Sequence, residues 1–427
     1  MSNFVQKDSG GIYDISLREH SETKPLKLSS RDLQTLRTEF NVSSPRIDVV
    51  HTSSQKVKLK SRQYVGVISF PDGPTIEILP KVEGANLLYL LRYAYGVESN
   101  TYEQRTLIAE GPNFIEAIAT LFETELERVF RQGLAKGYHT VSTSERYLRG
   151  RLNIHQQLQQ HPSTTTKFEC TYDELTHDIP LNRALLYAAS LLTPYLTDST
   201  LARRLGRYEQ RLQKRVTLTP ITVQQVKTLD VSRLTAHYKD ILRLVEMVIM
   251  NSFVEDFRSG HNMAFSLLVN MNTIFEKVVE NAFTDIVSDL TEYRALIQEQ
   301  TGSLLASGSY DVDIKPDIAL RDADQNIQFV GDAKWKTGKP QNQDFYQIAA
   351  YQNTHMCPGA LIYPDRLVSK EGGCELKNGL ETKIIELPTG RNSETYSEFK
   401  RLVKQQLWEA IEKSLSENIP ASGKDQI

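Results

Sequence analysis

Two aspartates and a lysine between residues 310 and 336 have the types and spacing that metal-assisted hydrolysis of a phosphodiester requires. Asp317 follows a proline, and Asp332 and Lys334 are two residues apart. Side chains two apart on a strand point to the same face of its sheet. Two carboxylates can hold a hard cation such as Mg²⁺, which activates water and stabilises charge on a phosphate. A lysine beside them adds a fixed positive charge.

The segment around these three residues predicts a β-hairpin. Asp332 and Lys334 then share one face of the second strand, while Ala333 and Trp335 point to the other. A polar turn at 321–326 separates two runs of alternating apolar residues, namely Val312, Ile314, Ile318 and Leu320, then Ile327, Phe329 and Val330. This alternation is typical of paired strands. A surface hairpin with ordinary charges is the alternative, and residue types alone do not exclude it.

A second stretch of the chain contains the same residue types in the same order. Pro364 and Asp365 are followed by Glu375 and Lys377. The Gly-Gly pair and scattered polar residues between them predict a loop. The strand-like context, rather than the residue types, therefore favours the first stretch as the chemical site.

The sequence before the hairpin predicts a helix that can supply a third carboxylate. Apolar residues recur at helical spacing through 272–290. Glu276 on this helix is the candidate, and it would complete a metal shell or polarise a water. Glu280 is an equally available rival, and either residue can instead be a solvated helix charge.

The sequence after the hairpin predicts a second helix and two strands. Gln347 and Tyr351 are four apart in 344–352, on one face of the predicted helix. The alternative is an amphipathic helix whose tyrosine belongs to the core. Short apolar runs at 359–364 and 382–388 predict strands. The order helix, hairpin, helix, strand predicts an α/β sandwich around a small mixed sheet.

The whole chain is predicted to be a multidomain α/β protein. A hairpin signal within residues 1–84 predicts a β-rich N-terminal domain, used for partner docking or forming the edge of a larger core. Residues 85–262 are predicted to be mainly helical, and 263–390 hold the elements described above. Residues 391–427 predict an amphipathic helix and a flexible tail.

One predicted helix, at 201–216, is strongly basic. The side chains proposed to share one side of it are Arg204, Arg207, Arg211 and Arg215. Such a face can contact DNA phosphates or a partner protein. The more common alternative is a solvated face whose arginines pair with acids nearby.

Composition limits the classes of protein that this chain can be. It has 427 residues, a net charge of −3 and three cysteines without CxxC spacing. A zinc site or disulfide framework is therefore not expected, and a reducing cytoplasm is the simplest location. No segment is apolar for long enough to span a membrane. There is no GxxxxGK[ST] loop, so an NTP-driven activity would need a motor on another polypeptide.

Together these elements resemble the PD-(D/E)xK endonuclease superfamily, and more narrowly the McrC family of McrBC-type, modification-dependent restriction systems. The resemblance rests on the hairpin and its flanking helices, on FVGDAKWK (329–336) and DFYQIAAYQ (344–352), and on upstream blocks at 76–96, 146–158 and 170–192. It implies a restriction-endonuclease-like nuclease domain in the C-terminal part of the chain.

The resemblance also implies roles for individual residues. Asp317, Asp332 and Lys334 would be catalytic, with Mg²⁺ (or Mn²⁺) held by the two aspartates and the carbonyl of Ala333. Glu276, Gln347 and Tyr351 are carried over as supporting catalytic residues. The implied partners are an McrB-type AAA+ GTPase, expected as a hexameric ring, and double-stranded modified DNA, for example DNA with 5-methylcytosine.

Two other functions remain open on the sequence alone. The chain can be a regulatory protein that docks on an NTPase and activates it, with a vestigial nuclease. It can also be a stand-alone, exonuclease-like nuclease, because a Gln-x-x-x-Tyr helix also occurs in such enzymes. The intact acidic pair and lysine oppose the first of these, and the negative net charge opposes the second.

Overall fold

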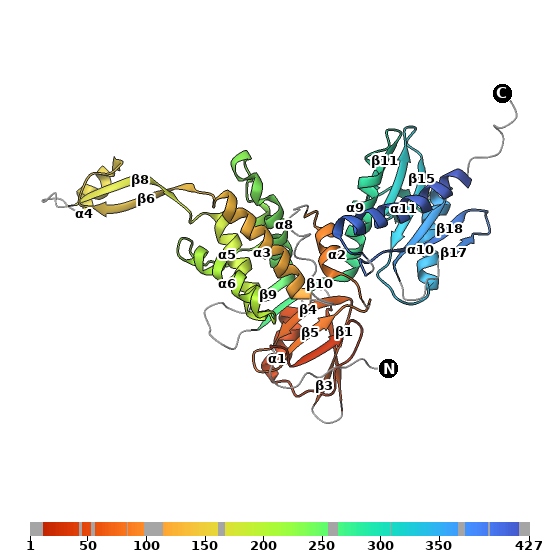
Figure 1. Cartoon of the computed structure of the whole chain (residues 1–427), viewed down its shortest axis with the longest axis horizontal. Coiled ribbons are helices and arrows are strands. Elements are labelled where there is room, and N and C mark those ends of the chain that lie inside the picture. Colours follow the sequence, from red (N-terminus) through yellow and green to blue (C-terminus); the bar gives the residue numbers. More distant parts are fainter. Residues whose placement is uncertain are drawn as a thin grey trace. The chain divides into compact units, whose positions relative to one another are not determined.

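The computed structural model describes residues 12–41, 45–52, 56–82, 84–97, 114–160, 167–254, 264–307, 309–365, 372–391 and 393–417. The chain divides into two compact units (Figure 1). The first combines Met1–Leu121 with Asn251–Ile427, and the second is Phe122–Met250. Both helices and sheets occur in each, so the protein is a mixed α/β, multidomain protein.

A five-stranded sheet organises the N-terminal part of the first unit. Its order is β1 (Ile15–Arg18), β5 (Thr75–Leu79), β4 (Tyr64–Ser69), β10 (Phe265–Asn270) and β9 (Ser252–Val254). The predicted hairpin is present as β4 and β5. Strand β10 lies within the segment expected to open the nuclease domain, yet it pairs antiparallel with β4. Gly66 permits this approach, because a Cβ there would lie 1.9 Å from the Leu267 carbonyl oxygen.

Smaller elements close the apolar face of this sheet. They are α1 (Ser30–Thr35), the π-helix η1 (Leu36–Phe40) and the hairpin β2 (Ile47–His51) and β3 (Val57–Ser61). Phe40 is fully buried and packs edge-on against Phe253 and tilted against Phe70, with 5.7 Å between ring centroids in both pairs. This core fixes the position of β1, and therefore of the residues that follow it.

A six-stranded mixed sheet forms the C-terminal part of the first unit. Its order is β11 (Tyr293–Ile297), β14 (Ile318–Asp322), β15 (Ile327–Ala333), β16 (Gly359–Pro364), β18 (Glu381–Leu387) and β17 (Gly372–Glu375). The central strands β15, β16 and β18 are parallel, and the outer pairs are antiparallel. Two short strands, β12 (Gly302–Ser303) and β13 (Asp313–Ile314), pair beside it. The predicted strands at 359–364 and 382–388 are thereby confirmed.

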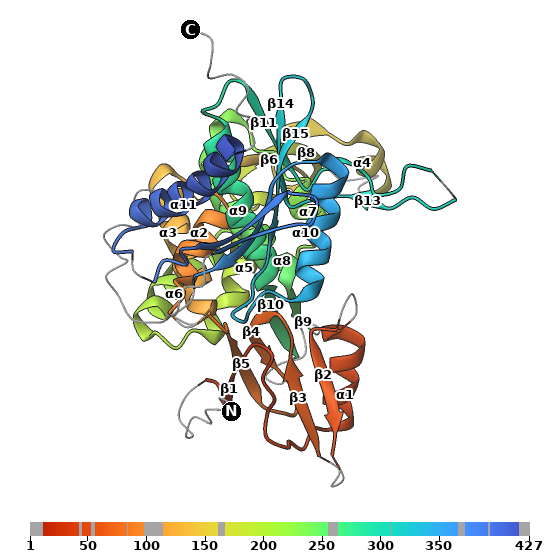
Figure 2. The ribbon, with the colours of Figure 1, turned by 90° about the vertical axis from the view of Figure 1, so that its right-hand side faces the viewer.

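Helices cover both faces of this sheet. Helices α9 (Met271–Val287) and α11 (Tyr396–Glu417) pack on each other and on β15, and α10 (Asn342–His355) packs on β15 and β16. Figure 2 shows the hairpin of β14 and β15 between α10 on one side and α9 with α11 on the other. All three helices confirm the predictions made from apolar spacing. The tail predicted after α11 lies at 418–427, outside the described residues.

Helix α2 (Leu87–Ala94) joins the N-terminal part to this sheet layer. Tyr89 stacks on Phe399 of α11, with ring centroids 5.7 Å apart. The side-chain amide of Asn281, on α9, donates to the Tyr93 carbonyl at 2.8 Å. The two sheets of the first unit are therefore connected by packed aromatic rings as well as by the chain.

The second unit is largely helical and carries a β arm. Its elements are α3 (Phe114–Gln132, which begins in the first unit), α5 (Pro180–Leu192), η3 (Thr193–Tyr195), α6 (Ser199–Gln213), α7 (Val223–Lys227), η4 (Arg233–Tyr238) and α8 (Lys239–Asn251). The arm consists of β6 (Gly137–Glu145), β7 (Arg151–Leu152), β8 (Phe168–Thr176) and α4 (Ile154–Gln160) (Figure 1). Exposed apolar side chains on it include Tyr138, Tyr147, Leu148, Ile154, Leu158 and Leu175.

Candidate active site

The hairpin of β14 and β15 brings the two predicted aspartates and the lysine together. Ile318 pairs with Gly331, so Asp317 lies just before β14, beside the end of β15. The Oδ2 atom of Asp317 accepts a hydrogen bond from the backbone amide of Ala333 at 2.7 Å. The Nζ atom of Lys334 lies 2.6 Å from Oδ2 of Asp332. The predicted hairpin is confirmed, and so is the shared face of Asp332 and Lys334.

Trp335, two residues beyond the end of β15, points into the opposite layer. Trp335 is 1% exposed, and its ring lies 5.6 Å from that of Phe275 on α9, centroid to centroid. Val330 lies two residues before Asp332 and therefore on the same face of β15. It packs with Ile348 and Tyr351 of α10. The acidic pair therefore faces the α10 layer, and the α9 layer receives the tryptophan.

Burial destabilises the charged form of the carboxyl groups in this cluster. Asp332 is 1% exposed, and burial together with Asp317 raises its pKa to about 6 against the opposing effect of Lys334. Burial also raises the pKa of Asp317. For Lys334, burial acts to lower the pKa, but the carboxylates of Asp332 and Asp317 outweigh it and raise the value. Two carboxylates in such surroundings favour the binding of a cation.

The two candidate glutamates on helix α9 have different charged neighbours. Burial and repulsion by Asp317 raise the pKa of Glu276 to about 7, and its carboxyl group also interacts with Lys334 and Asp332. Burial and Asp317 raise the pKa of Glu280 as well, but Glu280 accepts a hydrogen bond from the Gln298 side chain at 2.7 Å. Glu276 is thus the one whose charge responds to the whole cluster.

Helix α10 places Gln347 and Tyr351 on the side that the acidic pair faces. The amide of Gln347 donates to the Tyr351 hydroxyl at 2.8 Å, and that hydroxyl donates to the Lys315 carbonyl at 3.2 Å. Tyr351 is 8% exposed, and burial raises its pKa. The pair ties α10 to the backbone two residues before Asp317, which suits a role in positioning that strand.

The oxygen atoms that could bind a metal at this site suit a hard cation, but they are few. Within the described parts of the chain, no three His, Cys, Asp or Glu side chains lie close enough together to form a metal site. The two aspartates and a backbone carbonyl would therefore leave room for waters or substrate oxygens, as Mg²⁺ prefers. The buried Oδ2 of Asp332 is paired with the Lys334 ammonium at 2.6 Å. A bound cation would compete with that ammonium for this oxygen.

The raised pKa of Glu276 predicts how stability depends on pH. A carboxyl whose pKa is raised by folding contributes fully to stability below its ordinary pKa, and the contribution is lost as pH rises through the raised value. For Glu276 that window runs from 4.5 to about 7. In EDTA, Glu276→Gln should therefore have a Tm close to wild type near pH 5 and a clearly higher relative Tm near pH 8.

Thermal unfolding followed by circular dichroism across that window measures this difference. Glu292→Gln, on an exposed glutamate just before β11, is the matched control and should run parallel to wild type. Parallel curves for Glu276→Gln as well would contradict the placement of Glu276 in the buried cluster.

The arginines predicted to share a helix face do not form one continuous row. Arg204 lies 3.4 Å from the Glu123 carboxylate, and the Arg211 guanidinium stacks over the Phe130 ring at 4.4 Å. Helix α6 ends at Gln213, so helical spacing does not extend to Arg215. Arg207, Arg211 and Arg215 are exposed. Contact of this face with DNA or a partner remains a prediction.

The second stretch with matching residue types does not assemble a site. Asp365 accepts a hydrogen bond from the Thr389 amide at 3.0 Å, which fixes the turn after β18. Glu375 lies on the edge strand β17, opposite Glu381. The loop predicted there is wrong at 372–375, because the Gly-Gly pair belongs to β17, which pairs with β18.

The sequence did not predict several residues that hold the elements around the site in place. Lys336 lies 2.7 Å from the Asp344 carboxylate, which also accepts a hydrogen bond from the Tyr363 hydroxyl at 3.0 Å. Asp344 additionally forms a capping box with Gln341 at the start of α10. An acid three residues into a helix is a recognisable capping signal. Nothing local to the sequence indicates its second role of holding Lys336.

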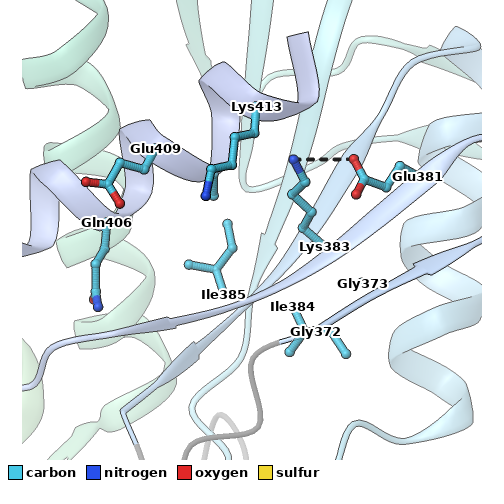
Figure 3. A pocket seen from close by; sticks show the side chains of 10 residues that line it. Gly372, Gly373, Glu381, Lys383, Ile384, Ile385, Gln406, Glu409 and Lys413 are labelled. Carbon is cyan, nitrogen blue, oxygen red and sulfur yellow. Dashed lines mark ion pairs between the residues drawn. The ribbon is translucent and has the colours of Figure 1, made fainter. Parts of the chain in front are cut away.

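A cavity of about 300 Å³ lies elsewhere, between β18 and α11 (Figure 3). Lys383 and Glu381 form an ion pair of 3.3 Å on its wall, and Gln406, Glu409 and Lys413 line it from α11. None of the predicted site residues belongs to it. Among the described residues, no helix has both the length and the apolar character required to cross a membrane.

Fold and site together define an α/β protein with a buried carboxylate–lysine cluster at the end of a central strand. Residues 59–364, more than half of the chain, match the model of the family described as McrBC 5-methylcytosine restriction system component. The chain belongs to this family. The resemblance to the McrC family of McrBC-type restriction systems is thereby confirmed.

Individual relatives are distant in sequence. The chain is 21% identical over 303 residues to the type IV methyl-directed restriction enzyme EcoKMcrBC of Escherichia coli (strain K12), covering 67% of this chain and 86% of that protein. A solved half-complex of Thermococcus gammatolerans McrB AAA+ hexamers with bound McrC contains a similar fold. Its TM-score is 0.60 at 20% identity, over 92% of this chain and 99% of the matched one.

Proposed function

We propose that this chain is the Mg²⁺-dependent endonuclease subunit of a modification-dependent restriction complex. The observation that carries the proposal is the cluster of Asp317, Lys334 and the buried Asp332, with its ion pair, in a member of the McrBC family. A buried acidic pair with raised pKa values is costly to maintain, which is typical of functional sites.

The cation would be held by the carboxylates of Asp317 and Asp332 and by the carbonyl of Ala333. When bound, Mg²⁺ (or Mn²⁺) lowers the pKa of a water and neutralises charge on the phosphate. The hydrogen bond from the Ala333 amide to Asp317 keeps that carboxylate at the end of β15. Because Asp332 is buried and Asp317 is held by the Ala333 amide, both acids are ordered before substrate arrives, and little rearrangement is required.

The other residues of the cluster would act on protons and charge. Lys334 holds a permanent positive charge beside Asp332, where it orients the attacking water and stabilises the phosphoryl oxygens. Glu276, with a pKa of about 7, is suited to accept a proton near neutral pH. Tyr351 and Gln347 hold the strand that carries Asp317.

Coupling to a motor protein is the second part of the proposal. The chain lacks a phosphate-binding GxxxxGK[ST] loop, so nucleotide hydrolysis coupled to cleavage would occur on a partner. The similar Thermococcus fold was solved with McrB AAA+ hexamers, which supports an AAA+ GTPase ring as that partner. The N-terminal domain at 1–84 is the proposed docking part. The β6–β8 arm, with its exposed apolar side chains, offers a further contact surface.

The substrate would be double-stranded DNA carrying a modified base such as 5-methylcytosine. The Escherichia coli relative is a methyl-directed restriction enzyme, which supports this class of substrate. Recognition of the modified base is expected on the partner, as the resemblance to the McrC family implies.

The test is cleavage of methylated plasmid by the chain together with its partner GTPase. Cleavage should require both proteins, GTP and Mg²⁺, and unmethylated plasmid should stay intact. Cleavage by the chain alone without nucleotide would support the stand-alone nuclease instead. Stimulated GTP hydrolysis without any DNA cleavage would support the regulatory protein. Either of these results would overturn the proposal.

A further inference from the structure

A buried glutamate of the N-terminal sheet contacts the catalytic strand. Glu19 follows β1 directly and is 4% exposed. Its Oε2 atom accepts a hydrogen bond from the indole nitrogen of Trp335 at 3.1 Å and another from the backbone amide of Lys81 at 2.9 Å. Residues 316 positions apart in the chain are therefore joined by one side-chain hydrogen bond.

Trp335 connects this contact to two elements of the proposed site. It is the residue after Lys334, and its ring packs against Phe275 at a centroid distance of 5.6 Å. Phe275 is the residue before Glu276 on α9. Any rotation or shift of the indole would therefore move both the backbone that carries Lys334 and the helix turn that carries Glu276.

The segment around Trp335 also has contacts within its own layer of the fold. The amide of Lys334 donates to the Ile362 carbonyl at 2.8 Å, and the Lys336 side chain pairs with Asp344 at 2.7 Å. These partners belong to the same mixed sheet and to α10. Glu19, by contrast, belongs to the N-terminal sheet, so it ties this segment to a different layer of the fold.

The hydrogen bond between Glu19 and Trp335 is better suited to orienting the indole than to stabilising the folded state. The Oε1 atom of Glu19 lies 4.0 Å from Lys81 Nζ and accepts no hydrogen bond within the described residues. Burying a carboxylate that is only partly satisfied costs more than an apolar pair of similar volume. Its benefit is directional, because a hydrogen bond from the indole N–H to a carboxyl oxygen is restricted in angle.

We propose that Glu19 is a positioning residue that aligns Lys334 and Glu276 through Trp335. The inference rests on the proposed nuclease function and adds to it a physical link from the proposed docking domain to the catalytic strand. Glu19 touches neither substrate nor metal in this arrangement. Its effect is on the rate of the chemical step.

The experiment compares Glu19→Ala with Glu22→Ala in the full chain with its partner. Glu22 is a matched control, since it is a partly exposed glutamate in the same domain whose partner, Lys58, lies 3.5 Å away. Glu19→Ala should lower kcat for cleavage by roughly ten- to a hundred-fold, because small misplacements of catalytic groups cost this much. The KM for DNA and the stimulated GTPase rate should stay unchanged, and Glu22→Ala should resemble wild type.

Two further variants separate positioning from general destabilisation. Trp335→Phe keeps an aromatic ring but removes the indole donor, and combined with Glu19→Ala it should cause no further loss. Glu19→Gln keeps an acceptor oxygen and should recover most of the kcat. In a Trp408→Phe background, Trp335 is the sole tryptophan, and its emission should shift in Glu19→Ala but not in Glu22→Ala.

The outcomes distinguish this inference from the function on which it rests. If wild-type chain and partner do not cleave, the proposed function fails, and the inference fails with it. If wild type cleaves while Glu19→Ala matches Glu22→Ala in kcat, only the inference fails. Equal losses in kcat, GTPase stimulation and Tm would also overturn it, because they would show a purely structural role.

Discussion

Asp332→Asn is expected to abolish DNA cleavage, with a loss of roughly 10³-fold or more, while the partner's GTPase remains stimulated. The side chain is 1% exposed, and its carboxylate is both the proposed metal ligand and the partner of Lys334 at 2.6 Å. Asparagine has the same shape but no charge, so it cannot neutralise a divalent cation or hold the lysine. Quantified cleavage of methylated plasmid, alongside GTP hydrolysis, measures both effects.

Folding of the Asp332→Asn variant should not be impaired. The pKa of Asp332 is raised to about 6, so near pH 7 the folded chain carries a buried charge that the amide removes. The Tm should therefore equal or exceed that of wild type. Asp365→Asn, the aspartate of the second stretch, is the control and should cleave normally. Undiminished cleavage by Asp332→Asn would refute the assignment of this cluster as the active site.

Lys334→Met is expected to have the second largest effect, lowering kcat by roughly 10²- to 10³-fold. The lysine supplies the fixed positive charge beside the acidic pair, and methionine keeps the apolar part of the side chain. Lys334→Arg should not restore the rate, because a planar guanidinium does not fit a site made for a compact ammonium. Single-turnover cleavage isolates the chemical step.

Metal binding should respond to Lys334→Met in the opposite direction. The ammonium of Lys334 competes with a cation for Oδ2 of Asp332, so its removal should strengthen Mg²⁺ or Mn²⁺ binding, measured by calorimetry. Lys377→Met, on an exposed lysine of the second stretch, should change neither property. A variant that binds metal more weakly and yet cleaves at the wild-type rate would contradict the role given to Lys334.

The predicted elements that the structure confirms share one property, which is that their signals are local. Alternating apolar residues at 327–330 and helical spacing at 272–290 each depend on neighbours within a few turns or strand residues. Asp332 and Lys334 are two apart, so the period of a strand alone places them on one face. Asp317 follows because the hairpin turn brings β14 back along β15.

Only the tertiary structure distinguishes candidate residues that the sequence pattern makes equivalent. Glu276 and Glu280 lie on the same helix, and only the packing of α9 places Glu276 where it interacts with both aspartates and the lysine. Asp365 has the same residue types around it as Asp317, but β16 directs it to the turn at Thr389. Arg215 has the spacing of a residue on the same helix face as the other arginines. However, α6 ends at Gln213, so Arg215 lies outside the helix.

By itself, the sequence of this protein determined the hairpin, its flanking helices and the shared face of Asp332 and Lys334, because these depend on short-range periodicity. The tertiary structure alone decided that β10 completes the N-terminal sheet beside β4, and that Glu19 accepts a hydrogen bond from Trp335. Both contacts join residues about two hundred or more positions apart, so no local pattern encodes them. They arise from the burial of apolar surface shared by distant segments, which only the folded chain brings together.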